Sequence, residues 1–119
     1  PIMLGDAGGA KSLDVVDVGM AVDLLSQHVY GNPGNGITKL YAQMLGSKLN
    51  VANGASDADI ADTLAAADAF LADHDHTDWK GLSKADQMMV LDWKSMFDAY
   101  NNGLIGPGHC DETFSVEFE

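Results

Sequence analysis

Four stretches of the chain carry apolar residues three and four positions apart, which is the spacing of one face of an α-helix. They run from Leu13 to Val29, from Ile37 to Asn53, from Ser56 to Leu71 and from Ser83 to Tyr100. Glycine and asparagine follow the first, second and fourth stretches, and these residues commonly end helices. The pattern therefore predicts a mainly α fold, with a bundle of four helices in residues 13–103.

The ends of the predicted helices carry their own signals. Ser56 and Ser83 are each followed by an aspartate three residues later, which is typical of a helix N-terminus. The run from Gly31 to Gly36 should stop the first helix. That helix is apolar on most sides, with Val18 and Val22 outside its main stripe. We expect it to be buried in the middle of the domain or to face a second partner.

Phe114, Val116 and Phe118 alternate with polar residues near the end of the chain. This period of two predicts a half-buried strand over residues 113–119. A single strand leaves its backbone groups unpaired, so it needs a neighbour. The evident partner within the chain is Ile2–Leu4, and the alternative is a sheet edge of another copy.

With 119 residues, the chain has the length of one domain. We expect a single domain, 1–119, in which a glycine-rich segment over residues 1–12 precedes the helical core. The N- and C-terminal segments together should supply a short β-strand element.

Charge excludes several classes of partner. Six lysines, no arginine and 18 acidic residues give a net charge of −12. Such a chain repels nucleic acid and anionic membrane surfaces, and no apolar run is long enough to insert into a membrane. The acidic composition and a start at Pro1 without a leader lead us to expect a processed, secreted protein at the cell surface or outside the cell.

A possible calcium loop lies near the start of the chain. On a twelve-residue EF-hand loop, Asp6 takes position 1, Asp14 position 9 and Asp17 position 12. Residues 6–25 therefore resemble a degenerate repeat of a dockerin, which implies Ca²⁺ as a cofactor. The other interpretation is a loop in which Asp14 and Asp17 merely start a helix, since Lys11 stands where the loop glycine belongs.

Two further groups contain metal-ligating residue types. His74 and His76 lie in an acidic run between the third and fourth helices, where they form a metal site only if the loop bends suitably. A solvated loop is the other interpretation. Cys110 is the only cysteine and follows His109. We expect it in a structural turn or in an inter-chain disulfide rather than in catalysis.

Residues 39–112 resemble an uncharacterised helical module of secreted bacterial surface proteins. The resemblance is carried by the runs KLNVANGA (48–55), AAADAFL (65–71) and DAYNNGLIGPGHCDE (98–112). It implies a helical fold and secretion, and it implies no activity.

These features predict a non-catalytic extracellular structural or adhesive module. Its partners are expected to be other copies of itself or another surface protein. Phe114, Val116 and Phe118 would add to a neighbour's sheet and build a fibre or surface layer. The alternative is a calcium-dependent module that binds protein or carbohydrate. An enzyme is not expected, because no nucleophile, base and oxyanion donor can be assembled from the sequence.

Overall fold

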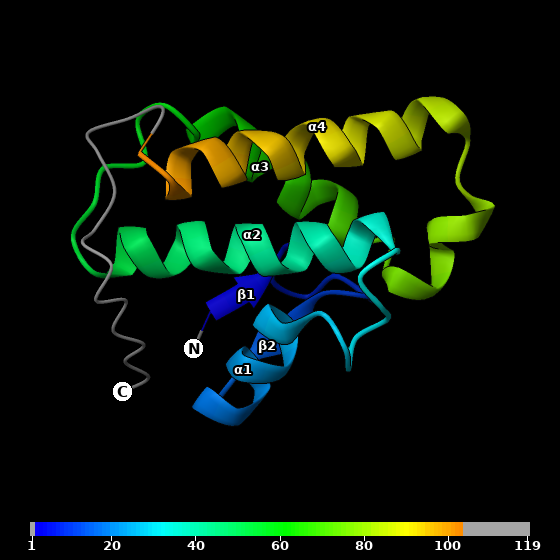
Figure 1. Cartoon of the computed structure of the whole chain (residues 1–119), viewed down its shortest axis with the longest axis horizontal. Coiled ribbons are helices and arrows are strands. Elements are labelled where there is room, and N and C mark those ends of the chain that lie inside the picture. Colours follow the sequence, from blue (N-terminus) through cyan, green and yellow to red (C-terminus); the bar gives the residue numbers. More distant parts are fainter. Residues whose placement is uncertain (1, 104–119) are drawn as a thin grey trace.

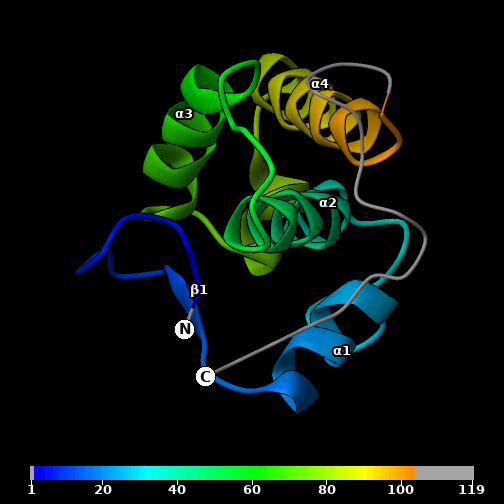
Figure 2. The same ribbon diagram turned by 90° about the vertical axis from the view of Figure 1, so that its left-hand side faces the viewer.

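The helix α2 (Gly36–Ala52) lies at the centre of the fold. The structure is a computed structural model, and it describes residues 2–103. Viewed nearly along α2, the helices α3 (Ala61–Leu71) and α4 (Lys84–Asn101) lie on one side of it, as Figure 2 shows. On the other side lie α1 (Val18–Ser26) and a two-stranded sheet. Because α2 has neighbours on both sides, most of its residues are buried.

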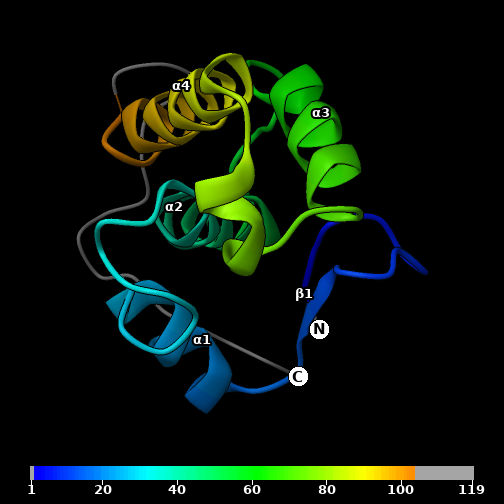
Figure 3. The same ribbon diagram turned by 90° about the vertical axis from the view of Figure 1, so that its right-hand side faces the viewer.

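The described residues form a mainly helical fold with one small antiparallel sheet. The strands β1 (Ile2–Leu4) and β2 (Leu13–Val15) pair so that Met3 lies opposite Asp14. A short 3₁₀ helix, η1 (His76–Gly81), precedes α4. The predicted four-helix bundle is not confirmed, because α1 is short and lies across α2 from α3 and α4 (Figures 1 and 3).

The polar residues of α2 are used in its contact with α4. Ser47 and Asn50 have polar side chains, yet both are buried. The side-chain oxygen of Asn101 accepts hydrogen bonds from the Ser47 hydroxyl at 2.9 Å and from the Asn50 amide at 3.1 Å. The Asn101 amide donates to the Gln43 carbonyl at 2.9 Å. Satisfied in this way, polar side chains can be buried at little cost.

The prediction of a helix from Leu13 is wrong. Leu13–Val15 is a strand, and its partner is Ile2–Leu4. The side chains of Val15 and Leu4 are buried on the core face of the sheet, whereas Asp14 is exposed. Apolar residues two apart fit a strand as well as a helix over such a short run. Ile2–Leu4, the predicted partner of residues 113–119, pairs with β2. The predicted C-terminal strand lies outside the described residues, so its pairing stays a prediction.

The first helix is also shorter at its end than predicted. It ends at Ser26, because Gln27 adopts a left-handed backbone with φ of 64°. This stop comes before the glycine run at 31–36, so Val29 lies outside the helix. The helix is not the buried centre of the domain either, since Val18 and Val22 are about half exposed, at 48% and 56%.

Two of the other helices start close to their predicted positions. α2 starts at Gly36, one residue before the predicted Ile37, and the side chain of Asn35 accepts from the amides of Ile37 and Thr38. α4 starts after Ser83, as predicted. α3 begins at Ala61 rather than after Ser56. The Ser56 hydroxyl instead accepts from the Ala58 amide at 3.2 Å, within a turn that precedes the helix.

Close packing fixes η1 against the start of α2. A Cβ atom on Gly36 would lie 2.3 Å from a ring carbon of Trp79. Only glycine leaves room for the indole at this distance, so the first turn of α2 and the 3₁₀ helix contact each other directly.

An ion pair attaches the sheet to the helices. The Lys48 ammonium on α2 lies 2.7 Å from the Asp68 carboxylate on α3, and each side chain is less than one-fifth exposed, at 18% and 19%. Lys48 also donates to the Met3 carbonyl of β1, and Asp68 accepts from the Gly5 amide at 2.9 Å. Two charged side chains therefore join α2, α3 and β1.

We predict that Lys48→Met lowers the free energy of unfolding by about 2 kcal/mol, because it leaves the largely buried Asp68 carboxylate without its cation and the Met3 carbonyl without its side-chain donor. Urea denaturation measures the loss. Lys39→Met is the matched control, because Lys39 lies on the same helix and forms no ion pair among the described residues. Equal effects of the two substitutions would contradict the role given to Lys48.

Candidate functional site

One edge of the sheet is closed by side chains. In an antiparallel ladder, alternate residues direct their N–H and C=O groups to opposite edges. The Met3 carbonyl and the Gly5 amide, two residues apart, bond to Lys48 and Asp68. The outer edge of β1 is therefore occupied by this ion pair, and the bonds to β2 come from Ile2 and Leu4.

The other edge of the sheet is open. Asp14 lies opposite Met3, so its N–H and C=O groups face away from β1. Asp14 is exposed, and no other described segment pairs with this edge of β2. An edge of this kind is a template for another strand.

Four exposed valines lie within or close after β2 and α1 in the sequence. The side chains of Val16, Val18, Val22 and Val29 are each about half exposed, at 48–57%. Val16 comes directly after β2, and Val18 and Val22 lie on α1, the next element along the chain. The open edge and these valines together form the candidate site, which we call the β2 edge surface.

The predicted calcium ligands have other roles in the structure. The Asp17 carboxylate caps α1 by accepting from the Met20 amide at 2.8 Å. Asp14 belongs to β2, and the Asp6 carbonyl accepts from the Gly9 amide at 3.0 Å and from the Ser12 hydroxyl at 2.7 Å. The helix-starting interpretation is thus correct for Asp17, whereas Asp14 lies in a strand. Calcium binding by Asp6, Asp14 and Asp17 stays a prediction.

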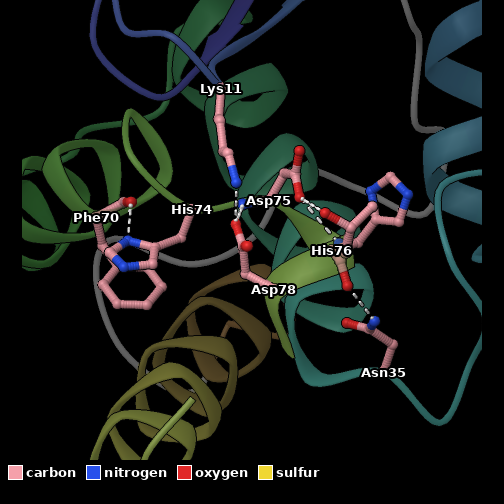
Figure 4. Close-up of polar contacts among 8 residues, drawn as sticks. Lys11, Asn35, Phe70, His74, Asp75, His76 and Asp78 are labelled. Atoms are coloured by element: carbon pink, nitrogen blue, oxygen red, sulfur yellow. Dashed lines mark hydrogen bonds and ion pairs between the residues drawn. The ribbon is translucent and has the colours of Figure 1, made fainter. Parts of the chain in front are cut away.

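The acidic run at residues 73–78 starts the 3₁₀ helix. Asp75 accepts from the Thr77 amide at 2.9 Å, and Asp78 accepts from the Asp75 amide at 2.9 Å, so the two form a reciprocal cap. Lys11 from the N-terminal loop lies 2.7 Å from Asp78 (Figure 4). The hydrogen bond from Lys11 holds the pKa of Asp78 below its usual range, with help from the Asp75 amide. The same bond raises the pKa of Lys11.

The two histidine rings of this run do not converge. His74 stacks on Phe70 with ring centroids 4.1 Å apart, and its Nδ1 lies 3.0 Å from the Phe70 carbonyl. His76 packs edge-on against Tyr30 and Tyr41. Figure 4 shows the rings on opposite sides of the turn. The two rings thus pack against different neighbours in this structure, and metal binding by His74 and His76 stays a prediction.

Two buried polar atoms belong to the neighbouring rings of Tyr41 and His76. Within residues 2–103, the Tyr41 hydroxyl and the Nδ1 atom of His76 are buried without a hydrogen-bonding partner. Burial raises the pKa of the Tyr41 hydroxyl, which therefore stays protonated and remains a donor.

Other predicted site residues lie beyond the described part. Cys110 and the predicted strand residues Phe114, Val116 and Phe118 fall outside residues 2–103. Within that range, no three histidine, cysteine, aspartate or glutamate side chains come together as a metal site.

Sequence reasoning missed the residues that shape this surface. Lys48 and Asp68 are twenty positions apart and carry no motif that pairs them. The sequence shows only that both residues are charged and lie in predicted helices. Many solvent-exposed residues have the same properties, so the ion pair could not be predicted.

Comparisons with protein-family models, curated proteins and solved structures find no match for this chain. Among the described helices, none combines the length and apolar character needed to cross a bilayer. The function is therefore inferred from the surface itself.

We predict that Asp17→Ala lowers the free energy of unfolding by about 1 kcal/mol in a chelating buffer, because α1 loses its cap. Thermal melts with chelator and with millimolar calcium measure the loss in both conditions. Equal losses support capping alone. A larger loss in calcium would show that Asp17 also binds the ion, since a ligand of the native state stabilises it.

We predict that Asp78→Asn destabilises the protein at neutral pH and that the difference from the unaltered protein shrinks in acid. The lowered pKa of Asp78 means that its contribution is full above the ordinary carboxyl pKa of about 4 and is lost as the pH falls through the lowered value. Urea denaturation at several pH values measures the difference. Asp73→Asn is the control, and a loss at Asp78 that is independent of pH would contradict the ion pair.

Proposed function

We propose that the protein is a non-catalytic extracellular structural or adhesive module that assembles through the β2 edge surface. The observation that carries this proposal is that the N–H and C=O groups of Asp14 face away from β1 at one edge of the sheet. The opposite edge, on β1, is already bonded to Lys48. An added strand obtains main-chain hydrogen bonds at such an edge and buries alternate side chains beside it.

The predicted strand at residues 113–119 fits this edge chemically. Its alternation of Phe114, Val116 and Phe118 with polar residues supplies one apolar face. Val16 and Val18, which follow β2 directly in the chain, offer exposed apolar side chains. A third strand also strengthens a two-stranded sheet, which is marginal by itself.

Strand addition of this kind joins unlike surfaces of two copies. The donor gives its C-terminal segment, and the acceptor gives β2. A contact between unlike surfaces that does not close into a ring repeats, and repetition builds a fibre or a layer. The acidic composition and the resemblance of residues 39–112 to a module of secreted surface proteins support a location outside the cell.

We predict that Asp14→Pro raises the protein concentration needed for assembly at least about 10-fold, because it removes the edge N–H and so a hydrogen bond to the added strand. Sedimentation velocity over a concentration series measures the assembly. Met3→Pro is the matched control, since its N–H faces the closed edge of β1.

Asp14→Ala separates the loss of charge from the loss of the N–H group. It should keep assembly, and circular dichroism should show the same helix content in all three variants. Deletion of residues 113–119 should abolish assembly. An unchanged oligomer after this deletion would rule the proposal out.

A further inference from the structure

The connection from the described part to the predicted C-terminal strand is long relative to the molecule. The described part ends at Gly103, shortly after α4, and Thr113 follows ten residues later. Ten extended residues span up to about 33 Å. The molecule measures 37 × 28 × 26 Å, so this connection is longer than either of its shorter dimensions.

Attachment to the same chain favours the chain's own strand over a neighbour's. A short connection gives an effective concentration on the order of millimolar at a site within its reach. A strand from a second copy reaches the same edge only at the actual protein concentration. Below millimolar protein, the chain's own segment therefore has the advantage.

The negative charge of the chain also favours its own strand over a strand from a second copy. Each copy carries a net charge of −12, and the stretch from β2 to the end of α1, residues 13–26, contains Asp14, Asp17 and Asp23 but no lysine. Bringing a second copy to this surface adds repulsion between two strongly acidic bodies, which salt screens over about 10 Å at 0.1 M. Closure within one chain does not bring in a second body.

We propose that the open edge of β2 is covered in the isolated protein by the chain's own residues 113–119, and that assembly proceeds by exchange of this segment between copies. This inference rests on the proposed function, because it names the occupant that a neighbour's strand displaces. The protein is then a closed monomer when dilute and at low salt. Higher concentration and higher ionic strength shift it toward exchanged assemblies.

The first test follows the Asp14 amide by hydrogen exchange in ¹⁵N-labelled, dilute, monomeric full-length protein. The amide should exchange at least about 10-fold more slowly than in a variant with Phe114→Ser, Val116→Ser and Phe118→Ser, because the closed form gives it a hydrogen bond. A variant with Ser115→Ala and Glu117→Gln alters only the polar positions and should keep the protection.

The second test changes the connection. Deletion of residues 105–108 leaves six steps from Gly103 to the strand and a reach of about 20 Å, below the shortest dimension of 26 Å. This deletion should lower the concentration at which assemblies form, because the shorter connection disfavours closure within one chain. Insertion of Gly-Ser-Gly-Ser after Gly108 keeps the reach and should leave the monomer closed.

The outcomes separate this inference from the proposed function. A protected Asp14 amide without assembly at any concentration supports closure and rejects the proposed function. Assembly with equal Asp14 exchange rates in the full chain and the triple serine variant rejects closure and leaves the proposed function standing. Failure of the shortened connection to promote assembly would contradict exchange between copies.

Discussion

The contact between Lys48 and Asp68 decides how the sheet is presented to other molecules. A strand of three residues cannot hold itself in place, and this pair fastens β1 to two helices through its backbone. The same bonds use the groups that would otherwise make the β1 edge attractive to another strand. Because one edge is used in this way, the remaining free backbone faces a single direction.

The acidity of the chain and its open edge act against each other. Exposed backbone and valines favour association, while a net charge of −12 keeps copies apart. Natural proteins often protect edge strands with inward or flanking charges. In this chain Asp14 is the charged residue on the edge strand. The other carboxylates add a repulsion between copies that weakens as the salt concentration rises.

Helix starts were predictable where one side chain performs the capping. Ser83 marks the start of α4, and the apolar spacing gave α2 to within one residue at each end. The start of α1 was not predictable from spacing, since Leu13–Val15 suits either period and only pairing with Ile2–Leu4 decides it. Ser56 resembled a cap equally well, but its hydroxyl bonds within a turn before α3.

The candidate site depends on contacts between residues far apart in the chain, and local patterns do not encode them. From their positions in predicted helices, Lys48 and Asp68 look like charged residues exposed to solvent. His74 and His76 are two residues apart in the sequence, but their rings pack against different aromatic neighbours. The His74 ring stacks on Phe70, and the His76 ring packs edge-on against Tyr41. Proximity in sequence therefore does not show which side chains contact each other in the fold.

The contact between Gly36 and Trp79 has a consequence for how this fold can vary. The indole occupies the space where any other residue at position 36 would place its Cβ, at 2.3 Å from a ring carbon. The two positions are therefore free to change only together, with a smaller side chain replacing the tryptophan before the glycine is lost. Paired variation at these positions, more than similarity in the loops, would mark a distant homologue that shares this arrangement of helices.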